Sequence, residues 1–187
     1  MEKRNFNIFV ACMIIGMTVF WLSVYSFTIL DVDPLHNIKN IFGDEDNVVV
    51  TIKGNVVEEF ELRLSDIKSD KYLQVLNKEF HIVNAIGREY DVIYSGVSLW
   101  SILDIENLLN PDSSTFLFIG GDGYYAETSL PLSLAENNTE QVILAYEQDG
   151  QPIFFEGPVI SVVDHELILD KANTHYLVKY LKTIMIQ

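Results

Sequence analysis

The longest apolar run in the chain spans residues 6–30 and contains no charged side chain. A helix of 25 residues, rising about 1.5 Å per residue, is long enough to cross a hydrocarbon core of about 30 Å. Lys3 and Arg4 precede the run, which places residues 1–5 in the cytoplasm and the rest of the chain outside the cell. The run is too long for a cleaved signal peptide and lacks a small-x-small site after it, so the sequence predicts a retained signal anchor.

Residues 31–46 differ from the chain on either side. They contain Pro34, Gly43 and the acidic run 44–46, a composition typical of a solvated linker. After this linker the pattern changes to short apolar stretches separated by Gly, Asn and Pro, which indicates a folded domain over residues 47–187.

The first part of this domain alternates as strands do. Residues 48–52 are β-branched, and residues 56–64 alternate apolar with charged side chains, so the sequence predicts two strands around a tight turn at Gly54-Asn55. Ser65 suits a helix N-cap, and apolar residues recur at helical spacing as far as Leu76. We therefore expect a short helix after these strands.

A second strand pair is predicted next. Residues 80–83 and 88–94 are rich in β-branched and aromatic side chains and flank a turn. Ser98 then precedes an amphipathic pattern that stops at Asn110-Pro111, which predicts a capped helix between these points.

The centre of the domain contains the strongest turn signals. Residues 115–119 are apolar on both faces, as in a central buried strand, and residues 120–123 form a glycine turn. Tyr124 is expected to begin a returning strand. Residues 141–147 predict a further strand, and Asp149-Gly150 is a strong two-residue hairpin turn.

The C-terminal part predicts short elements and then one long strand. Residues 131–134 suit a helical turn, residues 159–163 and 167–169 suit short extended pieces, and residues 175–186 alternate as in a long strand. The fold class expected from these patterns is α+β, mainly β, preceded by one transmembrane helix.

Charge and cysteine content exclude several functions. The 187 residues include 12 Lys and Arg against 27 Asp and Glu, a formal net charge of −15, and 49% hydrophobic residues, which is enough for the core of one domain. Once Glu2, Lys3 and Arg4 are set aside, 26 acidic and ten basic residues remain, and such a surface repels nucleic acid. Cys12 is the one cysteine, so the domain has no disulfide, cysteine zinc site or cysteine nucleophile.

Five segments resemble, in the same order, the molybdopterin-binding domain of the sulfite oxidase family. They are Tyr-Ser-Gly-Val-Ser-Leu-Trp-Ser-Ile-Leu (94–103), Gly-Asp-Gly-Tyr (121–124), Leu-Ala-Tyr-Glu-Gln-Asp-Gly-Gln-Pro-Ile (144–153), Gly-Pro (157–158) and Val-Lys-Tyr-Leu-Lys-Thr-Ile (178–184). The resemblance covers about residues 47–187. It implies a sulfite-oxidase-type molybdopterin-binding fold, a compact and mainly antiparallel β structure with peripheral helices.

The departures from that family concern its chemistry. In the catalytic members a cysteine thiolate binds molybdenum, and it would fall between about Phe80 and Asp91, where this chain has no cysteine. After its Gly-Pro step the family often has an arginine, whereas here residues 160–164 contain no cation and Asp164 would repel a cofactor phosphate. Lys179 matches the Val-Lys position of the family.

The predicted binding site lies over the glycine turn, the Tyr146 strand and Lys179. Its candidate cofactor- or ligand-binding residues are Arg88, Asp122, Tyr124, Tyr146, Lys171, His175 and Lys179. Asp122 has the alternative of capping its own turn, and the tyrosines that of ordinary core or rim residues. The histidines lack the spacing of metal ligands, so neither a metal site nor a catalytic residue is predicted.

Three functions follow from these patterns. The first is a membrane-anchored, extracytoplasmic module that binds a small molecule or a membrane protein partner, without catalysis and without a cofactor. The second is an oxidoreductase that holds molybdopterin without a protein thiolate, with Arg88, Lys171, His175 and Lys179 on the pterin phosphate. The third is a structural subunit of an envelope complex.

Overall fold

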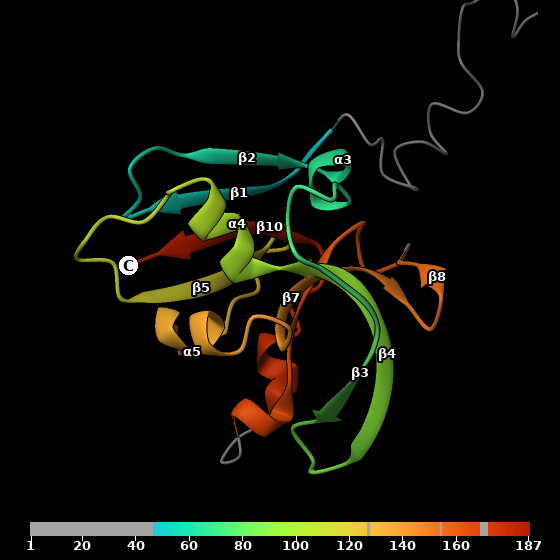
Figure 1. The fold of residues 1–187 in the computed structure, drawn as a ribbon. Helices are drawn as coiled ribbons and strands as arrows, with labels where there is room; N and C mark the ends of the chain where they lie inside the picture. The colour runs from blue at the N-terminus through green and yellow to red at the C-terminus, as the bar shows by residue number, and fades with distance from the viewer. Residues whose placement is uncertain (1–46, 127, 154, 169–171) are drawn as a thin grey trace, which may run out of the picture. The chain divides into compact units, whose positions relative to one another are not determined.

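The structure, a computed structural model, describes residues 47–126, 128–153, 155–168 and 172–187 (Figure 1). The predicted N-terminus 1–5, anchor 6–30 and linker 31–46 lie outside the described residues, as does Lys171. Among the helices of the described part, none has the length and apolar character needed to cross a membrane.

Two five-stranded sheets form the framework of the domain. The strand order of the first sheet is β2-β1-β10-β5-β6. Its strands are β1 (Val48–Gly54), β2 (Phe60–Arg63), β5 (Thr115–Gly120), β6 (Leu130–Pro131) and β10 (Leu181–Ile186). The first and last strands of the domain, β1 and β10, pair in parallel at the middle of this sheet, and the other pairs are antiparallel.

The second sheet is antiparallel throughout. Its strands are β3 (Gln74–Val83), β4 (Glu89–Ser98), β7 (Val142–Gln148), β8 (Gln151–Pro152) and β9 (Ile160–Val163). The β3–β4 hairpin is long and curved, and both β8 and β9 pair with β7 (Figure 1). At the β7–β8 turn Asp149 has φ 51° and Gly150 has φ 72°, which is the two-residue turn predicted from the sequence.

Short helices connect the strands. They are α3 (Leu64–Ile67), α4 (Leu99–Ile105), α5 (Leu132–Asn137) and the 3-10 helices η1 (His165–Leu167) and η2 (Asn173–Tyr176). Ser98 caps α4 as predicted, because its Oγ accepts the Ser101 N–H at 3.3 Å. The architecture is therefore mainly β with few helices, in agreement with the predicted α+β class.

Two hydrophobic cores hold the sheets. The larger core gathers buried residues from both sheets and from α4. The smaller core lies mostly on the second sheet, where it includes Phe80, Val92, Tyr94 and Ile160, and Ile153 joins it from outside the strands. The rings of Phe80 and Tyr94 meet edge to face at 5.8 Å, an arrangement that stabilises by about 0.5–1.5 kcal/mol beyond the area it buries.

Several predicted elements of the first half are wrong in length or type. The helix expected from Ser65 to Leu76 ends at Ile67, and Leu76 lies on β3 with 62% of its surface exposed. The β1–β2 connection is a loop rather than a tight turn at Gly54-Asn55, because Asn55 N–H donates to the Ile186 carbonyl instead. The helix after Ser98 ends at Ile105, well before Asn110.

The second half also departs from prediction. Strand β5 is buried on one face only, since Leu117 and Ile119 are half-buried. Tyr125 forms only an isolated bridge with Ile119, and the strand that returns along β5 is the two-residue β6, which pairs with Thr115 and Phe116. The predicted strand 175–186 begins only at Leu181, after η2 and after Tyr180 with its left-handed φ of 50°. Leu167 belongs to η1 rather than to an extended piece.

Candidate functional site

A cavity of about 320 Å³ lies at the open end of the smaller core. Tyr90, Val92 and Tyr94 form one wall, because alternate residues of β4 point to the same face of the sheet. The remaining lining residues come from three later segments and are Gln148, Glu156, Thr174, Leu177 and Lys179. The site is thus assembled from parts of the chain that are distant in sequence.

An ion pair closes one side of this cavity. Lys179 Nζ lies 2.5 Å from Glu156 Oε1, with the two side chains 51% and 29% exposed. The backbone beneath the pair is also joined, since Tyr180 N–H donates to the Glu156 carbonyl at 2.5 Å and Tyr180 Oη donates to the Phe155 carbonyl at 2.5 Å. These contacts fix the position of the lysine relative to the carboxylate.

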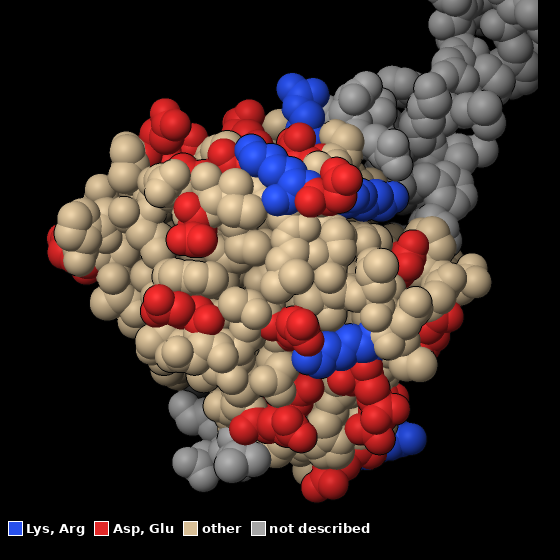
Figure 2. Space-filling view, viewed as in Figure 1, with Lys and Arg blue, Asp and Glu red and all other residues tan. Residues whose placement is uncertain are grey.

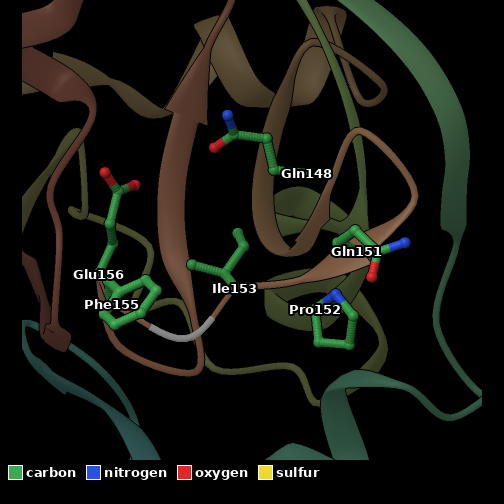
Figure 3. A pocket seen from close by; sticks show the side chains of 6 residues that line it. All are labelled: Gln148, Gln151, Pro152, Ile153, Phe155 and Glu156. Carbon is green, nitrogen blue, oxygen red and sulfur yellow. The ribbon is translucent and has the colours of Figure 1, made fainter.

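A second cavity of about 260 Å³ adjoins the first and shares Gln148 and Glu156 with it. Its other lining residues are Gln151, Pro152, Ile153 and Phe155. Figure 3 shows Phe155 and Glu156 on one side of this cavity, Gln151 and Pro152 on the opposite side, and Ile153 between them. We call the two adjoining cavities, with their lining residues, the groove.

The groove has the chemistry of a binding surface. Burial is the largest of the causes that raise the pKa of Tyr94, followed by the charge of Glu156, so this phenol stays protonated at neutral pH. Tyr90 and Phe155 add aromatic surface and Gln148 adds an amide. A nucleophile or general base needs a pKa tuned toward neutrality, which this phenol lacks.

The structure brings several predicted site residues close to the chain segment that carries Lys179, although of these only Lys179 lines the groove. The glycine turn packs on the chain segment that carries Lys179, because Gly121 N–H donates to the Tyr180 carbonyl at 2.8 Å. Tyr124 Oη donates to the His175 carbonyl at 3.2 Å. Asp122 accepts the Tyr124 N–H at 3.0 Å and so caps its turn, which was the alternative considered for it.

Two other predicted site residues lie elsewhere. Tyr146 is buried, and its hydroxyl donates to Gln74 Oε1 at 2.9 Å. Arg88 is exposed at the turn of the β3–β4 hairpin, where its N–H donates to Asn84 Oδ1 at 2.9 Å. Neither residue lines the two cavities of the groove.

A histidine pair joins the β3–β4 hairpin to η1, with His81 on β3 and His165 on η1. His81 Nδ1 lies 2.8 Å from Asp91 Oδ1, and its ring lies 5.7 Å from that of His165 in an edge-to-face contact. Nearby, Asp164 is buried and accepts the Glu166 N–H at 3.0 Å, and burial raises its pKa. Within the described ranges, no group of three or more His, Cys, Asp and Glu could hold a metal ion.

Comparison with known proteins supports the fold. The structure is similar to that of the sulfane dehydrogenase SoxCD from Paracoccus pantotrophus, with a TM-score of 0.60 and 17% sequence identity. The match covers 76% of this chain and 39% of that one, so the chain spans well under half of the SoxCD chain. At this identity the likeness shows the fold alone, and it supports a distant resemblance to the sulfite-oxidase-type molybdopterin fold. No protein-family model and no curated protein matches the sequence.

Most of the groove was not predicted from the sequence. Tyr90, Tyr94, Gln148 and Glu156 were absent from the candidate residues, although Lys179 was among them. The alternation of Tyr90, Val92 and Tyr94 was a signal that aromatic side chains share one face of a strand. What the sequence did not indicate is that the segment 155–157 folds back onto Tyr180 and completes the wall.

Proposed function

We propose that this protein is a non-catalytic binding module, held at the membrane by residues 6–30 and facing the outside of the cell. The groove is its binding surface. The observation that carries this proposal is the composition of the groove: aromatic walls, amide side chains, and a lysine already paired with a glutamate. Such a lining binds and orients a ligand, and it supplies no reactive group.

The donor set does not fit a thiolate-bound molybdenum pterin. The sequence has one cysteine, Cys12, and it precedes the domain. Among the residues that the structure describes, Lys179 is the sole cation that lines the groove, and it is paired with Glu156, so these residues offer a pterin phosphate no free positive charge. For these reasons we favour binding over molybdopterin-dependent oxidation.

Elemental and pterin analysis of the purified full-length chain separates these two functions. The chain is produced with added molybdate, and molybdenum and pterin are measured per mole of protein. We expect far less than one equivalent of either. Stoichiometric molybdenum and pterin would establish the oxidoreductase alternative and overturn the proposal.

Binding by the groove is tested with a library of small aromatic compounds, using ligand-observed NMR on the full-length chain. Tyr90 lines the groove and is 40% exposed, and Tyr124 lies outside its lining with a similar exposure of 43%. The compounds that bind the wild type should no longer bind Tyr90→Ala and should still bind Tyr124→Ala. Equal loss in both variants, or binding that survives in both, would contradict a site at the groove.

A further inference from the structure

The groove has an outward-facing anchor that its own domain leaves uncovered. Phe155 is 91% exposed and lines the second cavity, so it is an uncovered aromatic side chain beside a hollow in the surface. Its backbone is held in place, since its carbonyl accepts the Tyr180 hydroxyl at 2.5 Å and the next residue, Glu156, accepts the Tyr180 N–H. Because this backbone is already fixed, binding would have to order only the aromatic side chain, and aromatic residues are typical of the centre of an interface.

The backbone around Phe155 is strained at Tyr180 and tightly packed at Gly157. Tyr180 adopts φ 50°, a left-handed conformation that is unfavourable for a residue with a side chain. Gly157 has φ 90° and approaches so closely that a Cβ there would lie 2.8 Å from Tyr180 Cα. Strain of this kind persists where the surrounding contacts impose it, and here it presents Phe155 at the edge of the groove.

The dimensions of the groove suit an extended ligand. The two cavities share Gln148 and Glu156, and their linings extend from Tyr90 in the first cavity to Pro152 in the second. The side-chain amides of Gln148 and Gln151 can both donate and accept, as the peptide groups of an extended chain require. Figure 3 shows Gln151 and Phe155 on opposite sides of the second cavity, with Ile153 between them.

The negative charge of the protein favours a basic ligand over an acidic one. The net charge of −15 repels a second copy of this protein and acidic ligands, and Figure 2 shows carboxylates scattered widely over the visible face. Glu156 is the carboxylate of the groove, and half of its partner Lys179 is exposed. A basic side chain from a ligand can therefore replace Lys179 at Glu156 while Lys179 turns to solvent.

We propose that the groove receives an extended, basic segment of a partner protein, with Phe155 as the apolar anchor and Glu156 as the acceptor of an arginine or lysine. This inference rests on the proposed function and names the ligand class for the same groove. We propose a protein segment rather than a small molecule because the ligand must span both cavities. Phe155 lines only the second cavity, and Glu156 lines both.

The test uses two libraries of random decapeptides that differ at one fixed position, arginine in one and glutamate in the other. Peptides are selected on the immobilised full-length chain. We expect enrichment from the arginine library and none from the glutamate library. Binding of the enriched peptides should weaken at least about tenfold in Phe155→Ala, as for an interface hot spot, and Glu156→Gln should reduce the preference for arginine.

Ile86→Ala is the matched control, because Ile86 is 88% exposed and lies at the far turn of the β3–β4 hairpin, outside the groove lining. Its peptide affinity should equal that of the wild type. Enrichment from neither library, or equal weakening by Phe155→Ala and Ile86→Ala, overturns the inference. If aromatic compounds still bind in a Tyr90-dependent manner while both libraries fail, the proposed function stands and this inference alone is wrong.

Discussion

At the scale of single residues, His81 joins β3 to β4 by a contact that depends on pH. It is the register partner of Asp91, and its Nδ1 lies 2.8 Å from the Asp91 carboxylate. This hydrogen bond is the largest cause that raises the pKa of His81, and the charges of Asp91 and Glu89 act in the same direction. The folded state therefore binds a proton more tightly than the unfolded chain, whose histidine titrates near about 6.5.

The sign of the pH effect follows from linkage. A raised folded pKa contributes stability that is fully present below about pH 6.5 and is lost as the pH rises through the folded value. The melting temperature of His81→Ala should therefore fall further below that of the wild type at pH 5.5 than at pH 9. A double-mutant cycle with Asp91→Ala measures the coupling free energy between His81 and Asp91. A coupling of equal size at both pH values would contradict the predicted pH dependence.

Tyr146 illustrates a different use of a polar residue. Its buried hydroxyl donates to Gln74 Oε1, and the amide of Gln74 donates in turn to the carbonyls of Ile67 at 3.0 Å and Ser69 at 2.7 Å. The tyrosine thus supports the connection between α3 and β3. The sequence placed it in the predicted binding site as a tyrosine that could line a pocket beside the glycine turn, but its side chain lines neither cavity of the groove.

Tyr146→Phe tests this structural role. Removing the hydroxyl leaves a part-buried acceptor without its donor, so the free energy of unfolding should fall by about 1 kcal/mol. Urea denaturation measures the loss. Tyr90→Phe serves as the control, because Tyr90 is more exposed and its change should be smaller. Binding of aromatic compounds by Tyr146→Phe should match that of the wild type. A loss of binding would mean that Tyr146 does contribute to the binding site.

At the scale of elements, the glycine turn shows why two adjacent glycines are not equivalent. A Cβ at Gly120 would lie 2.6 Å from Asp122 Oδ1 and 2.9 Å from the Lys179 carbonyl. At Gly121 the nearest atom would be the Tyr180 carbonyl oxygen at 3.5 Å, an ordinary contact. The end of β5 therefore needs a glycine so that it can approach the chain carrying Lys179.

We expect Gly120→Ala to lower the free energy of unfolding by about 1–3 kcal/mol, as overpacking does. Gly121→Ala should change it by less than about 0.5 kcal/mol. Chemical denaturation of both variants gives the comparison. Because the clash at Gly120 involves the Lys179 backbone, this variant should also weaken groove binding, and equal stability of the two variants would refute the close approach.

Elements set by local signals were predicted well, and those set by distant pairing were not. The Ser98 cap and the Asp149-Gly150 turn each depend on a few adjacent residues, and both are present. The helix expected through Leu76 fails because Gln74 and Val75 pair with Val97 and Gly96 on β4. Leu76 had the spacing of a helix face, yet it is exposed on a strand, so its periodicity arose by coincidence.

At the scale of the whole molecule, the sequence predicted the mainly β class and one groove residue, Lys179. The other walls of the groove depend on contacts between β4, the segment 155–157 and the chain before β10. Such contacts join residues that are far apart in the sequence, 25 positions in the case of Phe155 and Tyr180, and they leave no local pattern. Glu156 had no sequence signal at all, since its importance comes from Lys179 and Tyr180 lying beside it.

The excess of negative charge is a property of the whole domain. Carboxylates outnumber cations so strongly that several of the described cations are already paired, as in the ion pairs Lys71–Glu106 and Lys78–Glu140. Most of the remaining charge therefore repels itself, and this repulsion opposes the compact state. Salt screens charges more than about 10 Å apart at 0.1 M and acts on long-range repulsion more than on close pairs.

The melting temperature of the full-length chain should therefore rise between 20 mM and 500 mM NaCl at pH 7.5. The variant Glu58→Lys with Glu59→Lys tests the cause, since both side chains are exposed between β1 and β2 and lie outside the groove lining. Each substitution adds two units, which moves the formal net charge from −15 to −11. The salt-induced rise should be smaller in this variant than in the wild type, because less repulsion remains to be screened. A melting temperature that falls with salt would mean that attractive ion pairs outweigh the repulsion, and a rise of equal size in both proteins would assign it to general salt effects rather than to charge.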